Sequence, residues 1–167
     1  ATVCNEKQIK KIIFTSSVAV YGFAKAGTDE TGDINPFNEY GRTKYLAEEK
    51  LRAWQRGAEN SLIIVRPTVI FGEGNRGNVF NLFNQIKSGK FLMIGNGKNK
   101  KSMAYIANVV AFLEACLDSS QRYSVFNYVD TPDLTMNELV SEVRSKLLGK
   151  AGVGWRLPYV FGIIIGY

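Results

Sequence analysis

The chain has 167 residues, of which 46% are hydrophobic and 22% charged, as in an ordinary globular protein, and no apolar run reaches the length of a membrane span. It contains no histidine, which excludes a Ser-His-Asp triad and any metal site built on histidine. The net charge of +6 comes from scattered lysines without arginine-rich runs, which argues against nucleic acid and leaves a solvated basic surface or an anionic small ligand.

Residues 1–8 have the pattern of the end of a helix, and they contain the first of two cysteines, Cys4. The second, Cys116, is far away in the sequence, and the two do not have the spacing of metal ligands. Both lie among apolar residues, so we expect two buried free thiols. Free thiols indicate a reducing compartment, and we therefore expect a cytoplasmic protein.

Residues 11–16 form an apolar, β-rich run, which predicts a parallel strand buried on both faces. Ser16 and Ser17 stand at its carboxyl end, which is where open α/β sheets bind ligands. The following residues, 23–36, are polar and rich in glycine, which predicts a loop.

Residues 38–54 are predicted to form a helix ended by Gly57, with an inward face of five residues at spacings of four, three, four and three: Tyr40, Lys44, Ala47, Leu51 and Trp54. Charged residues, Glu48 among them, fall off this face. A free tyrosine, with a pKa of about 10, is a poor base at neutral pH, but a lysine cation one turn away favours the phenolate. Such a pair can exchange a proton with an alcohol or a carbonyl. The alternative is a packed tyrosine ring beside a lysine that extends to solvent.

The rest of the chain alternates strand and helix patterns. The expected strands are 61–66, 91–94, 104–106 and 125–129, and the expected helices carry apolar residues over 79–86, 109–116 and 139–147. Asn108 can cap the second of these helices. Thr135 and Glu138 form a capping box for the third, and Gly149 suits its end. This alternation predicts an α/β fold with a mostly parallel sheet.

Four segments arrive in an order that is typical of one family. They are residues 13–22 (Ile-Phe-Thr-Ser-Ser-Val-Ala-Val-Tyr-Gly), 40–44 (Tyr-Gly-Arg-Thr-Lys), 66–72 (Arg-Pro-Thr-Val-Ile-Phe-Gly) and 95–110. With these segments the chain resembles the extended short-chain dehydrogenase/reductases, the NAD-dependent epimerase/dehydratase family, over about residues 5–145. The resemblance implies an incomplete Rossmann-like parallel sheet with flanking helices and part of a small substrate-binding region.

The same resemblance implies a single partial domain over residues 1–167. About 1–72 would form the C-terminal half of the Rossmann-like part, and about 73–167 would mix substrate-binding and sheet-completing elements. The Gly-x-x-Gly-x-x-Gly turn that receives the pyrophosphate of NAD is absent, because only ten residues precede Lys11. We therefore expect a fragment of a longer enzyme that by itself neither binds NADH tightly nor turns over.

The resemblance also implies roles for individual residues. Tyr40 would be the general acid/base, Lys44 would favour its phenolate and hydrogen-bond the nicotinamide ribose, and Ser17 would hold the substrate oxygen. The cofactor, NAD or NADP, would be bound by Ser16, Tyr40, Lys44, Pro67 and Val69. The cofactor would carry out the hydride transfer, while the protein orients it and handles the proton.

A nucleotide-linked sugar is the substrate class that the resemblance favours. In the family an arginine of the basic turn commonly meets the diphosphate, and Lys101 occupies that position here; a lysine acts as a point charge without the bidentate fork. Asn78, at the start of a helix, would also bind the substrate. The alternative for the turn is a solvated basic loop.

Some positions depart from the family pattern. Val69 stands where many members have asparagine, and Asn108 where they have aspartate. No acidic residue stands beside Ser17, where Val18 and Ala19 follow, which disfavours dehydration and leaves epimerisation or reduction of a keto sugar. Two alternatives stay open: a hydroxysteroid- or dihydroflavonol-type reductase, and a relative without catalytic activity. As partners we expect the substrate and a second copy of the chain, and neither nucleic acid nor membrane.

Overall fold

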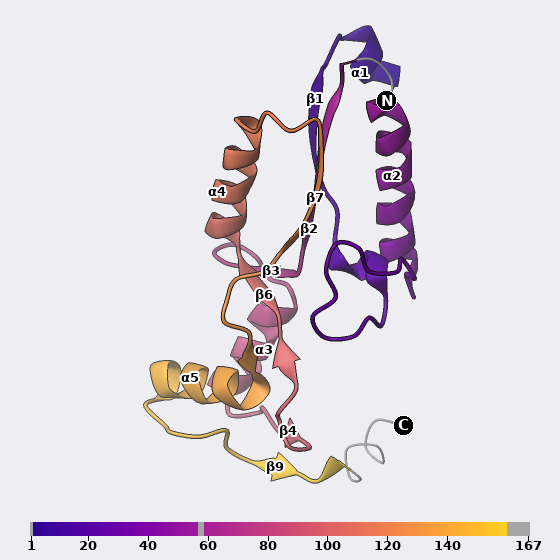
Figure 1. Ribbon diagram of the computed structural model, residues 1–167. Coiled ribbons are helices and arrows are strands. Elements are labelled where there is room, and N and C mark those ends of the chain that lie inside the picture. Colours follow the sequence, from indigo (N-terminus) through magenta and orange to yellow (C-terminus); the bar gives the residue numbers. More distant parts are fainter. Residues whose placement is uncertain (1, 57–58, 160–167) are drawn as a thin grey trace. The chain divides into compact units, whose positions relative to one another are not determined.

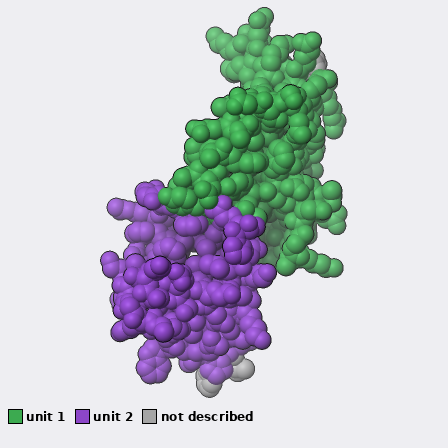
Figure 2. All heavy atoms as spheres, turned by 60° about the vertical axis from the view of Figure 1, so that its left-hand side comes forward, with its two compact units in different colours: residues 1–70, 104–129 green, residues 71–103, 130–167 purple. Residues whose placement is uncertain are grey.

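The computed structural model describes residues 2–56 and 59–159. The chain divides into two compact units, shown in different colours in Figure 2. The first comprises residues 1–70 and 104–129, and the second comprises residues 71–103 and 130–167. The expected organisation as a single partial domain stays a prediction.

The first unit is built on a parallel sheet with the strand order β1-β2-β7, formed by Lys11–Thr15, Ser61–Pro67 and Tyr123–Tyr128. The central strand β2 is the most deeply buried, because its run from Leu62 to Val65 has no exposed side-chain surface. This is the pattern expected of a parallel strand covered on both faces. The α/β class and the parallel sheet predicted from the sequence are therefore confirmed.

Helices cover both faces of this sheet. Figure 1 shows α2 (Glu39–Gln55) on one side and α4 (Ile106–Leu117) on the other, with α1 (Thr2–Glu6) before β1. Ile63 and Val65 of β2 pack with Cys116 of α4. The rings of Phe112 and Phe126 meet edge to face, with their centres 5.5 Å apart. Gly57, expected to end the first long helix, lies outside the described residues.

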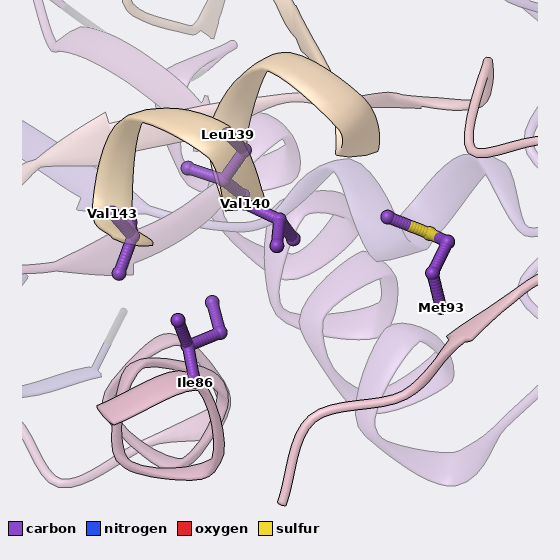
Figure 3. Close-up of a cluster of buried hydrophobic side chains, with 5 residues drawn as sticks. All are labelled: Ile86, Met93, Leu139, Val140 and Val143. Carbon is purple, nitrogen blue, oxygen red and sulfur yellow. The ribbon is translucent and has the colours of Figure 1, made fainter. Parts of the chain in front are cut away.

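The second unit has a separate apolar core. Its helices α3 (Asn78–Lys87) and α5 (Met136–Leu148) face each other, and Figure 3 shows the buried side chains that they and the strand β4 contribute: Ile86, Met93, Leu139, Val140 and Val143. Short strands border this core. Met93–Ile94 (β4) pairs with Arg156–Leu157 (β9), and Lys100–Lys101 (β5) pairs with Leu134–Thr135 (β8). Val69–Phe71 (β3) and Met103–Tyr105 (β6), most of whose residues belong to the first unit, form a separate pair.

Local capping rules predicted α5 correctly but failed for α4. The Thr135 side chain accepts a hydrogen bond from the Glu138 amide, the Glu138 carboxylate accepts one from the Thr135 amide, and Gly149 ends the helix with a left-handed backbone. Asn108 is not a cap. Helix α4 starts directly after β6 with Tyr105 as its N-cap, so Asn108 lies exposed within the first turn.

Both cysteines are free thiols, as predicted, but only Cys116 is buried, whereas Cys4 is partly exposed. Burial raises the pKa of the Cys116 thiol, against a smaller opposing effect of Lys11. Within residues 2–56 and 59–159, no helix is long and apolar enough to cross a membrane.

Candidate functional site

The two serines that follow β1 have different environments. Ser16 is buried, and its amide donates a hydrogen bond of 2.7 Å to the carbonyl of Val65 in β2. Ser17 is half-buried and caps the short 3-10 helix η1 (Val18–Tyr21), because its Oγ accepts a hydrogen bond of 3.2 Å from the Ala19 amide. A hydroxyl that accepts in this way still has an O–H to donate, so Ser17 can donate to a ligand oxygen.

The first turn of α2 presents Tyr40. Asn38 caps this helix through a bond of 2.8 Å from the Gly41 amide to its side-chain oxygen, and Tyr40 is the second helical residue. Its side chain is 55% exposed, so the predicted inward face does not extend to Tyr40. The first turn of α2 lies beside η1, because Gly41 approaches the carbonyl of Ala19 there. Lys44, one turn later, reaches the last residue of β1 through its Nζ.

Lys44 connects Tyr40 to the end of β1. Its Nζ donates a hydrogen bond of 2.9 Å to the carbonyl of Thr15 and lies 5.8 Å from the centre of the Tyr40 ring and 5.3 Å from that of Phe14. The lysine is half-buried. The structure thus brings Tyr40, Lys44 and the strand end that precedes Ser17 together, as the sequence pattern predicts.

A glycine lets α2 approach η1 closely. A Cβ atom placed on Gly41 would lie 2.4 Å from the carbonyl oxygen of Ala19 and 3.0 Å from the Cβ of Pro36. A second glycine, Gly22, ends η1 with a φ of 66°, and a Cβ there would lie 1.9 Å from the carbonyl oxygen of Asn35. The backbone segments around the Ser17 turn and the Tyr40 helix are therefore packed without room for side chains.

Pro67 ends β2, and Val69 follows it, at the same edge of the sheet as Ser17. In the parallel register Thr15 is opposite Val65, which puts Ser17 and Pro67 two residues further along their strands. Pro67 is buried, Val69 is 37% exposed, and the amide of the intervening Thr68 donates to the carbonyl of Tyr128 at 3.0 Å. This carboxyl edge is the usual ligand-binding edge of an open parallel sheet.

The other two predicted site residues, Asn78 and Lys101, belong to the second unit. Asn78 is exposed and opens α3, whose N-cap, Gly77, offers no side-chain hydrogen bond. Lys101 is half-buried in β5, opposite Leu134. Its neighbour Lys100 is opposite Thr135. The pKa of Glu138 is lowered mainly by the hydrogen bonds to Thr135 and to a smaller extent by the charge of Lys100. Tyr40 belongs to the first unit, so the proposed roles of Asn78 and Lys101 beside it stay predictions.

Sequence reasoning missed a buried ion pair next to this site. Glu48 was expected on the solvent side of its helix, but it has no exposed surface and forms two hydrogen bonds with the equally buried Arg66, at 2.9 and 2.6 Å. Burial by itself would raise the pKa of Glu48, but the hydrogen bonds and the charge of Arg66, helped by Ser16 and Arg52, outweigh it and lower the pKa. The carboxylate therefore stays charged in the core.

Two features of the sequence point to this pair. Arg66 ends an otherwise apolar strand, and a charge in a buried strand needs a partner. Glu48 comes one helical turn after Lys44, on a side of the helix that the sheet can cover.

Comparison with known proteins gives a consistent result. The profile of the NAD dependent epimerase/dehydratase family matches residues 1–128. The chain is 54% identical over 162 residues to N-acetyl-alpha-D-glucosaminyl-diphospho-ditrans,octacis-undecaprenol 4-epimerase of Escherichia coli O157:H7, covering 95% of this chain and 49% of that protein. It is 30% identical to UDP-glucose 4-epimerase of Vibrio cholerae, covering 90% of this chain and 46% of that protein. The chain thus spans about half the length of these curated relatives.

A solved structure agrees on the fold. The UDP-glucuronic acid 4-epimerase from Bacillus cereus, in complex with NAD, superimposes with a TM-score of 0.81 at 21% identity, covering 94% of this chain and 53% of that chain. At this identity the likeness supports the Rossmann-like fold and nothing finer.

Proposed function

This chain belongs to the NAD dependent epimerase/dehydratase family, and we propose that the full-length protein is an NAD-dependent 4-epimerase of an N-acetylhexosamine joined to a diphosphate. The observation that carries the proposal is the 54% identity, over 95% of the chain, to a 4-epimerase whose substrate is such a sugar on undecaprenol. The relative that is 30% identical is a 4-epimerase of a UDP-linked sugar. A sugar diphosphate is the chemistry that these two names share.

In this proposal Tyr40 accepts the proton of the sugar 4-hydroxyl when C4 is oxidised, and returns a proton when C4 is reduced from the other face. Two observations support this role. The phenol ring is 55% exposed at the carboxyl edge of the sheet, and the ammonium of Lys44 lies 5.8 Å from the ring centre. Ser17 donates its O–H to the same sugar oxygen and keeps it aligned with Tyr40.

The residues at this edge fit a nicotinamide ribose. The Lys44 ammonium has three N–H groups, and its bond to the Thr15 carbonyl uses one of them, so it can also donate to a ribose hydroxyl. Pro67 and Val69 would border the ring through backbone and shape, and Ser16 is proposed to bind the same cofactor. The bound cofactor supplies the removal and return of hydride at C4. The chain's own residues position the sugar and move the proton.

Residues of the second unit are proposed to bind the diphosphate. Lys101 provides a positive charge, and Asn78 stands at the N-terminus of a ten-residue helix, whose amide groups attract anions. The nucleotide-linked sugar predicted from the sequence and the lipid-linked sugar of the 54% identical relative both carry this group. The assay below therefore compares the two groups that can be joined to the other end of the diphosphate, a nucleoside and a polyprenol.

The test is an epimerisation assay with the full-length protein and NAD. UDP-N-acetylglucosamine and a polyprenyl-diphospho-N-acetylglucosamine are incubated separately, and the released sugars are separated by chromatography. We expect N-acetylgalactosamine to form from one of the two carriers. Tyr40→Phe should lower kcat by about 10²- to 10⁴-fold, the usual contribution of a positioned acid/base.

Tyr45→Phe is the matched control, because it removes a phenol hydroxyl from the same helix one residue after Lys44. It should leave kcat unchanged. The proposal fails when neither carrier yields the epimer, or when Tyr40→Phe is as active as the wild type.

A further inference from the structure

The buried cluster around Arg66 connects several elements of the site unit. Its guanidinium, 1% exposed at the end of β2, makes the two hydrogen bonds to Glu48 of α2. A third N–H of the guanidinium donates a hydrogen bond of 2.6 Å to the hydroxyl of Tyr21, the last residue of η1. The centre of the Tyr21 ring lies 4.9 Å from the guanidinium carbon. The Tyr21 hydroxyl in turn donates a hydrogen bond of 2.8 Å to the side-chain oxygen of Asn127 in β7. The guanidinium of Arg66 thus joins α2, β2 and η1, and through Tyr21 it also connects to β7.

These elements carry the residues proposed to act on the substrate. Glu48 lies one turn after Lys44 and two turns after Tyr40 on α2. Tyr21 closes the short helix that Ser17 opens. The cluster therefore contacts both α2 and η1. None of its residues is among those proposed to contact the substrate or the cofactor.

Stability alone is a weak reason for such a cluster, because an apolar replacement of a buried ion pair is often as stable. Geometry is a better one. A guanidinium presents its N–H groups in fixed directions, so a bidentate bond to Glu48 sets the rotation of α2 about its axis, and the bond to Tyr21 sets the position of η1 relative to it. On the solvent side Arg52 donates a hydrogen bond of 3.1 Å to the Glu48 carboxylate and so holds it in that orientation.

We propose that Arg66, Glu48 and Tyr21 are positioning residues that align Tyr40 and Lys44 of α2 with Ser17 at the start of η1. This inference rests on the proposed function, because it takes Tyr40 and Ser17 as the groups that meet the sugar oxygen. Loss of the alignment changes the rate of proton transfer, since small displacements of a catalytic group carry large rate penalties. Binding of the sugar diphosphate by the second unit is unaffected.

Tyr21→Phe in the full-length protein is the principal test. It keeps the ring over the guanidinium and the Glu48–Arg66 pair, and removes only the hydroxyl between Arg66 and Asn127. We expect kcat to fall on the order of tenfold with KM nearly unchanged. Arg66→Lys, which keeps the charge but loses the fork, should act in the same direction. Tyr45→Phe again serves as the control with unchanged kcat.

A double-mutant cycle with Tyr40→Phe distinguishes positioning from a structural role. Once Tyr40 has lost its hydroxyl there is no proton acceptor to align, so Tyr21→Phe should have little further effect on kcat in that background. A merely structural cluster would lower the melting temperature and reduce kcat by the same factor in both backgrounds, or leave kcat unchanged, and either result overturns the inference. If Tyr40→Phe itself is fully active, the proposed function fails, and the inference fails with it. If only Tyr21→Phe and Arg66→Lys are without effect on kcat, the inference alone is overturned.

Discussion

Replacing Gly41 by alanine tests whether the contact between α2 and η1 controls the site. The new Cβ would lie 2.4 Å from the Ala19 carbonyl oxygen, whereas carbon and oxygen normally approach to about 3.3 Å. The first turn of α2 must therefore move away from η1 by about 1 Å. Tyr40 is the residue before Gly41 and moves with it, and a displacement of this size can lower the rate about 100-fold.

The same substitution should leave the protein folded, because its cost is smaller than the free energy of unfolding of a typical domain. Overpacking costs about 1–3 kcal/mol, and replacing glycine by alanine within a helix returns up to about 1 kcal/mol. Urea unfolding and kcat of full-length Gly41→Ala are measured together. Gly27→Ala is the control. It also introduces an alanine, here into a strained left-handed backbone with a φ of 83°, but its new Cβ atom has no neighbouring atom within 4 Å. A folded Gly41→Ala protein with kcat within twofold of wild type would refute the reasoning.

Three further predictions concern other parts of the chain. Glu48→Gln should lower the free energy of unfolding by about 3 kcal/mol at pH 7. Because the folded pKa of Glu48 is lowered, this difference should persist above pH 4.5 and shrink as the pH falls through the folded pKa, as measured by urea unfolding at several pH values. In the native protein Cys4 should react with a thiol reagent much faster than Cys116, which is 5% exposed and whose pKa is raised by burial. Lys101→Ala should weaken competitive inhibition by UDP about tenfold, the loss of one charge-assisted contact.

Each of these predictions has a contrary outcome. An unfolding difference for Glu48→Gln that stays constant down to pH 3 would mean that the carboxylate charge contributes nothing. Equal thiol rates in the native protein would show that Cys116 is accessible, and Cys4→Ser identifies which thiol is slow. An unchanged UDP inhibition constant for alanine variants of Lys98, Lys100 and Lys101 would leave the basic turn as solvated surface.

Features that depend on neighbouring residues were predictable from the sequence. The capping box of Thr135 and Glu138 and the glycine stop at Gly149 are set by bonds within a few residues, and all three are present. The buried parallel strand over residues 61–66 followed from its unbroken apolar run, since only a strand covered on both faces tolerates it. The pairing of Tyr40 with Lys44 followed from helical spacing.

Features that depend on distant partners were not predictable in this way. Asn108 has a good capping side chain, but the start of α4 is determined by where β6 ends, and tertiary structure overrides the local preference. Glu48 is charged and was expected at the surface, but its partner Arg66 is 18 residues further along and becomes a neighbour only when α2 packs on β2. The exposure of Tyr40 likewise depends on how far α2 extends beyond β1, which periodicity cannot indicate.

The most direct measurement is a structure of the full-length protein with NAD and the sugar diphosphate that it epimerises. The account predicts that the Tyr40 hydroxyl lies within hydrogen-bond distance of the sugar 4-oxygen, about 2.6–3.2 Å, with the Ser17 hydroxyl on the same oxygen. A bound substrate whose 4-oxygen is held by other residues, with Tyr40 directed to solvent, would contradict it.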